Sequence, residues 1–216
     1  MENLVVFHSQ KTTKYTRLTK SIVLANSAHG GFDGGAVAND GTVEKDINLN
    51  ISLILKDILE FNGYKVIMTR TEDTATDKNG ASSITSRKKD DMQNRLKLMK
   101  DNPDAVYVSI HLNKFTTSAA NGAQVFYSGN FSESAALGEF IQSSIVSRLQ
   151  PENNRVIKKG TKSTYILYNA KVPAVIVECG FLSNTKELMN LKDEKYQSEM
   201  AFCIAAGIFD FFSGNL

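Results

Sequence analysis

The strongest constraint on the fold is the alternation of short apolar runs with amphipathic segments along a chain of 216 residues. Five runs are apolar almost throughout, as expected of strands buried on both faces of a sheet. They cover residues 21–25, 64–69, 105–110, 123–127 and 174–178. Strands that alternate with helices predict a twisted, mainly parallel sheet with helices on both faces. The predicted fold class is therefore α/β, and the length suits a single domain.

Four amphipathic segments are predicted as helices, over residues 44–63, 83–103, 132–151 and 195–213. In the first of them Ile47, Ile51, Ile54 and Ile58 recur at helical spacing, and Gly63 supplies a stop. In folds of this class the active site lies at the carboxyl ends of the strands. The residues that follow each strand are therefore the candidates for function.

The charge balance and the first residues restrict the class of protein further. The chain has 25 basic and 23 acidic residues, which is too even to predict a nucleic-acid interface. No apolar run approaches the roughly 20 residues that cross a bilayer. Residues 1–20, including His8, form a polar, basic stretch that is expected to be a leader or linker before a domain at 21–216. Taken as it stands, the sequence contains no targeting segment and predicts a cytoplasmic protein. If residues 1–20 are instead a linker, a targeting segment before them has been removed.

The two cysteines do not form a CxxC motif. Cys179 follows an apolar strand and Cys203 lies in an apolar helix. Cysteines in such elements are predicted to be small buried packing residues and not a disulfide.

Four ionisable residues are expected at one edge of the sheet. His29 follows the first strand, His111 follows the third, and Glu178 ends the 174–178 strand. Glu44 opens the first helix, where a helix N-terminus favours an anion. Two histidines and one carboxylate are a known ligand set for catalytic zinc, which leaves the fourth position open. The remaining carboxylate would then serve as the general base.

Each of these residues also has an ordinary explanation. His29 could form a hydrogen bond within a glycine turn, His111 could be a core histidine, and Glu44 could be a first-turn helix acid. Glu178 is harder to explain in this way, because a carboxylate that closes an apolar strand is costly without a partner. A phosphate loop is excluded, since the stretch AHGGFDGG contains neither glycine fingerprint and Asp33 would repel a phosphate. Its glycines instead suggest a tight turn beside a metal.

The chain resembles the zinc-dependent N-acetylmuramoyl-L-alanine amidases from about residue 21 to residue 213. The resemblance rests on HGGFDGGA (29–36), Glu44-Lys45, MTR (68–70), SIHLN (109–113), GAQVFY (122–127) and PAVIVECGFLSN (173–184). With SRKKDDMQNR (86–95) and no added wall-binding module, it is most similar to the sporulation-specific cortex amidases of the CwlD type.

This resemblance implies a function and a role for each site residue. His29, Glu44 and His111 would hold one zinc ion, and Glu178 would be the catalytic acid and base. The substrate would be the amide between the lactyl group of N-acetylmuramic acid and L-alanine, on peptidoglycan strands with stem peptides. Cleavage in the spore cortex would be the first step to muramic-δ-lactam, outside the cytoplasm. Asn113 and Arg70 are candidate substrate contacts, with a turn residue and a surface or ion-paired arginine as the respective alternatives.

One departure from the family pattern lies just before His29. The family has Asp-Pro-Gly where this chain has Asn26-Ser27-Ala28. Loss of a nearby carboxylate and of a stiff turn is expected to orient His29 less firmly and to weaken zinc binding. Two further hypotheses follow from this departure: dependence on an accessory protein of the spore envelope, and a non-catalytic peptidoglycan-binding protein. A generic zinc peptidase is a third alternative.

Overall fold

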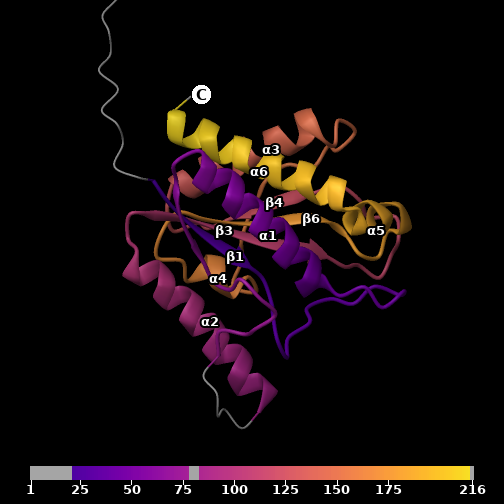
Figure 1. The fold of residues 1–216 in the computed structure, drawn as a ribbon, viewed down its shortest axis with the longest axis horizontal. Helices are drawn as coiled ribbons and strands as arrows, with labels where there is room; N and C mark the ends of the chain where they lie inside the picture. The colour runs from indigo at the N-terminus through magenta and orange to yellow at the C-terminus, as the bar shows by residue number, and fades with distance from the viewer. Residues whose placement is uncertain (1–20, 78–82, 215–216) are drawn as a thin grey trace, which may run out of the picture.

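The computed structural model describes residues 21–77 and 83–214, so the predicted leader and His8 lie outside the described residues (Figure 1). Six strands form one sheet in the order β2-β1-β3-β6-β4-β5. Their bounds are β1 (Ile22–Ser27), β2 (Lys65–Met68), β3 (Ala105–Asn113), β4 (Gln124–Tyr127), β5 (Lys158–Lys159) and β6 (Ala174–Phe181). Strands β2, β1, β3 and β6 are parallel, whereas β4 runs antiparallel to β6. The predicted mainly parallel sheet is confirmed, and the short strand β5 was not predicted.

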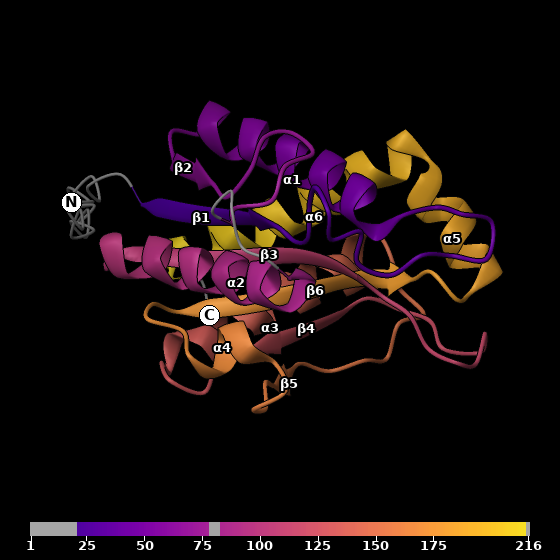
Figure 2. The ribbon, with the colours of Figure 1, turned by 90° about the horizontal axis from the view of Figure 1, so that it is seen from below.

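Helices cover both faces of the sheet, as predicted (Figures 1 and 2). One face carries α1 (Glu44–Phe61), α3 (Glu133–Arg148) and α6 (Glu194–Ser213), and the other carries α2 (Ile84–Asp101) and α4 (Tyr165–Tyr168). Helix α5 (Thr185–Lys192) contacts β6 and α6. Helices α4 and α5 were not predicted. None of the helices in the described ranges combines the length and apolar character needed to cross a bilayer.

Successive residues of the central strands enter two separate cores, which explains why these strand sequences lack polar alternation. In β3, Val106 and Val108 pack in the core under α1, α3 and α6, whereas Tyr107 packs in the core under α2 and α4. Cys179 and Cys203 are free thiols buried in the first of these cores. Their predicted role as packing residues is confirmed.

Close contact between α3 and α6 leads to a test of the packing. A Cβ added at Gly207 of α6 would lie 2.5 Å from the Cα of Ile141 in α3. We expect Gly207→Ala to lower the free energy of unfolding by about 1–3 kcal/mol, because the helices must move apart. Gly138→Ala is the matched control, since the nearest atom to its Cβ would be Cγ1 of Val125, at 3.5 Å. The control should gain about 0.5–1 kcal/mol. Equal stabilities of the two variants in urea would contradict this account.

Candidate metal centre and active site

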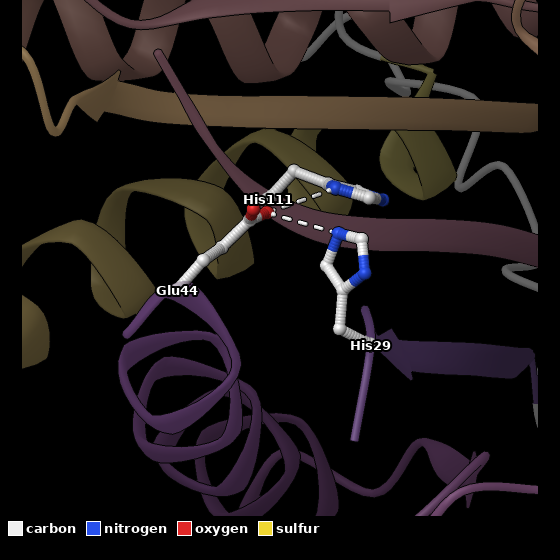
Figure 3. A group of neighbouring side chains, drawn as sticks. All are labelled: His29, Glu44 and His111. Carbon is white, nitrogen blue, oxygen red and sulfur yellow. Dashed lines mark hydrogen bonds and ion pairs between the residues drawn. The ribbon is translucent and has the colours of Figure 1, made fainter. Parts of the chain in front are cut away.

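Three predicted ligands meet at the carboxyl edge of the sheet (Figure 3). His29 follows β1, Glu44 is the first residue of α1, and His111 lies in β3. Glu44 Oε1 is 3.1 Å from Nδ1 of His111 and 3.4 Å from Nε2 of His29. One candidate ligand atom from each residue lies within 4.8 Å of the other two. Two imidazole nitrogens and one carboxylate oxygen therefore face one small volume.

Glu44 is a buried carboxylate that the backbone holds in place. It is 3% exposed, and its oxygens accept hydrogen bonds from the backbone N–H groups of Ala36 (2.8 Å) and Leu112 (3.0 Å). Burial by itself raises the pKa of Glu44, but its hydrogen bonds with His111 and His29 outweigh burial and hold the pKa well below its usual range. Glu44 is thus an anion aimed at two imidazoles, which is an arrangement that favours a cation between them.

His29 is oriented by a carboxylate within its own loop. Its Nδ1 lies 2.8 Å from Oδ2 of Asp33, and this contact leaves Nε2 facing Glu44. Burial lowers the pKa of His29, but the hydrogen bonds with Asp33 and Glu44 outweigh it and raise the pKa to about 9. A carboxylate on the second ring nitrogen fixes the tautomer and orientation of a ligating histidine. Asp33 was missed as a functional residue in the sequence, where its position four residues after His29 was the available signal.

Gly35 allows the loop to pass close to two of the ligands. It has a φ of +71°, and an added Cβ would lie 2.5 Å from Oε2 of Glu44 and 2.7 Å from Cδ2 of His29. Any larger residue would have to displace one of these side chains. The predicted tight turn itself lies at Gly30–Asp33, where each backbone N–H donates to the carbonyl of the other residue.

Arg95 lies in α2 and connects the end of β1 to the helix layer that α2 and α4 form. The side chain is 4% exposed and pairs with Asp91, with Nε 2.7 Å from Oδ2. Its guanidinium also donates to the backbone carbonyls of Ser27 (3.2 Å) and His29 (3.3 Å), and to Oδ1 of Asn26. Arg95 thus fixes the backbone from which His29 projects.

The altered residue before His29 has a different role from the one expected. Asn26 is buried between Arg95 and Ser109, and its Nδ2 donates to Oγ of Ser109 at 2.6 Å. The carboxylate that orients His29 comes from Asp33 instead. The loss of a carboxylate at position 26 therefore does not explain a poorly oriented His29, because Asn26 points toward Arg95 of α2. The effect of losing the stiff turn stays a prediction. The zinc affinity itself stays a prediction.

Glu178 faces the cluster without belonging to it. It pairs with His111 in the register of β3 and β6, and the three-residue cluster does not include it. Its Oε2 is buried and has no hydrogen-bond partner among the described residues. Burial raises the pKa of Glu178 above its usual value. The charge of Glu44 also raises this pKa, whereas the charge of His111 lowers it. A carboxylate with a raised pKa at such an edge is suited to general acid and base catalysis.

Arg70 has a position that differs from the one predicted. The side chain is 5% exposed, and all three guanidinium nitrogens donate to backbone carbonyls. These carbonyls belong to Ser27, Ala28, Lys45 and Glu72. The geometry therefore favours a structural role for Arg70, which joins the loop after β1 to α1, over contact with a substrate.

Asn113 remains a candidate for substrate contact. It is the last residue of β3, two positions after His111, and it is half-buried. The register of β3 against β6 shifts between His111 and Asn113. Asn113 thus lies two residues beyond His111 at the carboxyl end of β3, and its contact with a substrate stays a prediction.

Fold and site together define an α/β protein with a candidate metal centre at the carboxyl edge of its sheet. Residues 22–210 match the profile of the N-acetylmuramoyl-L-alanine amidases. The chain belongs to this family and is an N-acetylmuramoyl-L-alanine amidase.

Three relatives show how far the similarity extends. The germination-specific N-acetylmuramoyl-L-alanine amidase of Bacillus subtilis (strain 168) is 35% identical over 196 residues, which cover 91% of this chain and 81% of the relative. The CwlD amidase from Clostridioides difficile, solved in complex with the GerS lipoprotein, is 36% identical with a TM-score of 0.87, covering 91% of this chain and 100% of that one. The amidase AmiC2 of Nostoc punctiforme is 28% identical with a TM-score of 0.76, covering 90% and 98%.

The contact between Asp33 and His29 can be tested by metal binding alone. We expect Asp33→Asn to weaken zinc binding by about 10- to 100-fold, because His29 loses the carboxylate that orients it. Asp40→Asn is the matched control, since Asp40 is an exposed residue nearby whose ion pair is with Lys192. Competition with a chromophoric chelator would measure both affinities. Equal affinities for Asp33→Asn and the wild type would contradict the orienting role.

Proposed function

We propose that this amidase uses one zinc ion per chain to hydrolyse the amide between the lactyl group of N-acetylmuramic acid and L-alanine. The observation that carries the proposal is the convergence of His29, Glu44 and His111 within 4.8 Å. The donor set fits zinc, since two histidines and one glutamate are a known three-ligand set for a catalytic site. We expect no nucleic-acid partner, because basic and acidic residues are nearly balanced in the chain.

The residues divide the chemistry between them. When bound, zinc would polarise the lactyl carbonyl and lower the pKa of water. Oε2 of Glu178 accepts a proton from the attacking water, and the same carboxyl returns that proton to the nitrogen of the departing alanine. The carbon–nitrogen bond breaks, which leaves a lactyl carboxylate and a free amine. Glu44 stays anionic throughout because its hydrogen bonds hold its pKa low.

The biological setting is proposed from the relatives. The similar Bacillus subtilis protein is named germination-specific, which supports action on spore cortex, outside the cytoplasm. There the cleavage would be the first step to muramic-δ-lactam. The similar CwlD amidase was solved with the GerS lipoprotein, which supports an accessory protein of the spore envelope as a partner for this chain.

Digestion of purified peptidoglycan by the zinc-loaded protein tests the reaction. Mass spectrometry of the products should find stem peptides with L-alanine at the amino terminus. Cleavage within the peptides would instead indicate a zinc peptidase. Absence of any product would indicate a peptidoglycan-binding protein that does not catalyse, or one that needs its partner.

A further inference from the structure

A polar groove lies beside the catalytic edge, along strands β4 and β5 and the loops that flank them. Its volume is about 430 Å³, and its lining includes Gln124, Arg155 and Lys158. Neither the proposed zinc ligands nor Glu178 lines this groove. It is therefore a separate site next to the chemistry.

The groove is connected to Glu178 through the sheet. Gln124 of β4 is the cross-strand partner of Glu178 in β6. The next pair, Val125 and Val177, points into the core under α1, α3 and α6, so Gln124 and Glu178 point to the opposite face. Directly paired residues have Cβ atoms about 4.5–5.5 Å apart. A substrate bound at Glu178 would thus extend into the groove within one residue's length.

Arg155 is held in place while part of its guanidinium stays available. Nε donates to the backbone carbonyl of Asn121 at 2.6 Å, and Nη1 donates to Oε1 of Gln124 at 3.1 Å. The guanidinium also lies 4.8 Å from the centre of the Phe181 ring. Nη2 has no hydrogen-bond partner within the described ranges. An arginine fixed in this way loses little conformational freedom when it binds an anion.

The charge in the groove is positive and unbalanced. Arg155 and Lys158 form no ion pair with any carboxylate in the described part of the chain. None of the described residues that line the groove is acidic. The charge of Arg155 acts on the nearby Glu187 carboxylate. The oxygens of Glu187 accept hydrogen bonds from the backbone N–H groups of Gly122 and Phe181, however, and Glu187 forms no ion pair with Arg155 among the described residues. Among the residues that the structure describes, no acidic side chain thus balances the two cations of the groove.

We propose that this groove binds a carboxylate of the stem peptide, with Arg155 as its main contact and Lys158 as a second cation. The inference rests on the proposed amidase function and adds the side on which the peptide lies. N-acetylated sugars carry no charge, and the lactyl carboxyl is consumed in the amide that is cut. Only the peptide side of the substrate offers carboxylates, so a cationic groove selects that side.

Paired substrates test the proposal. Two soluble muramoyl peptides would differ only in the carboxylate of the second peptide residue, which is free in one and a carboxamide in the other. We expect wild type to favour the free carboxylate in kcat/KM by about 10-fold or more, as for loss of a charge-assisted hydrogen bond. Arg155→Gln should remove this preference, so that the ratio of the two kcat/KM values falls to about 1. Lys158→Gln should reduce the preference, and added salt should reduce it further in wild type.

The controls separate this inference from the function on which it rests. Lys171→Gln is the matched control, because Lys171 is an exposed cation just before β6, at the opposite edge of the sheet. It should keep the wild-type preference. Arg155 also supports the local fold, so equal loss on both substrates would indicate a folding defect, and Lys158→Gln then decides. Equal rates of wild type on both substrates would overturn the groove proposal and leave the amidase function intact. Hydrolysis of neither substrate, nor of peptidoglycan, would overturn both.

Discussion

Glu178→Gln should reduce hydrolysis by about 100- to 10,000-fold while zinc stays bound. The amide of glutamine cannot accept the proton of the attacking water, and the substitution touches none of the three clustered residues. Turnover of a soluble muramoyl peptide and elemental analysis of the same preparation would measure the two quantities side by side.

The control and the contradicting result for this prediction are both simple. Glu139→Gln changes an exposed glutamate of α3 and should leave turnover and zinc content unchanged. Loss of zinc from Glu178→Gln would make Glu178 a ligand, and the assignment of roles would be wrong. Retention of full activity would remove its role as a base.

His29→Ala and His111→Ala should each lose both bound zinc and activity. Catalytic zinc sites use three protein ligands, and two protein ligands rarely hold the ion. In each variant only Glu44 and one imidazole would remain of the cluster. Zinc content after dialysis and amidase activity would be measured on each purified variant.

His8→Ala serves as the matched control, since His8 is the one histidine of the chain outside the predicted ligand set. Its zinc content and activity should equal those of wild type. Stoichiometric zinc in either His29→Ala or His111→Ala would show that the replaced histidine is structural. Circular dichroism of each variant would show whether the fold is intact.

Local sequence patterns predicted most of the fold because each was set by a few neighbouring residues. The isoleucines of α1 recur at helical spacing, and the strand runs are apolar on both faces, as burial between two helix layers requires. The direction of β4 could not be predicted in this way. Residues 114–123 join the end of β3 to the start of β4 without a helix, and both lie at the same edge, but β6 from later in the chain separates the two strands.

The site was predictable where a residue's place depended on a strand end, and less so where it depended on a distant partner. His29, His111 and Glu178 follow from the parallel sheet. Arg95 was missed because its partners, Asn26 and the backbone after it, lie on another element. A signal was present, since Arg95 shares the buried face of α2 with Met92 and Met99. An arginine on an apolar helix face needs buried partners.

Because β4 runs in the reversed direction, catalysis and peptide binding depend on different segments of the chain. The clustered ligands depend on β1, β3 and α1, whereas the neighbouring groove depends on residues 114–123 and on the segment between α3 and β5. Loops of this kind tolerate changes in length and sequence better than the elements they connect. An amidase with this architecture can acquire a new preference among peptides by evolution of two loops alone. For the engineer, the same loops are the parts to exchange when the enzyme is to be directed to a different cell wall.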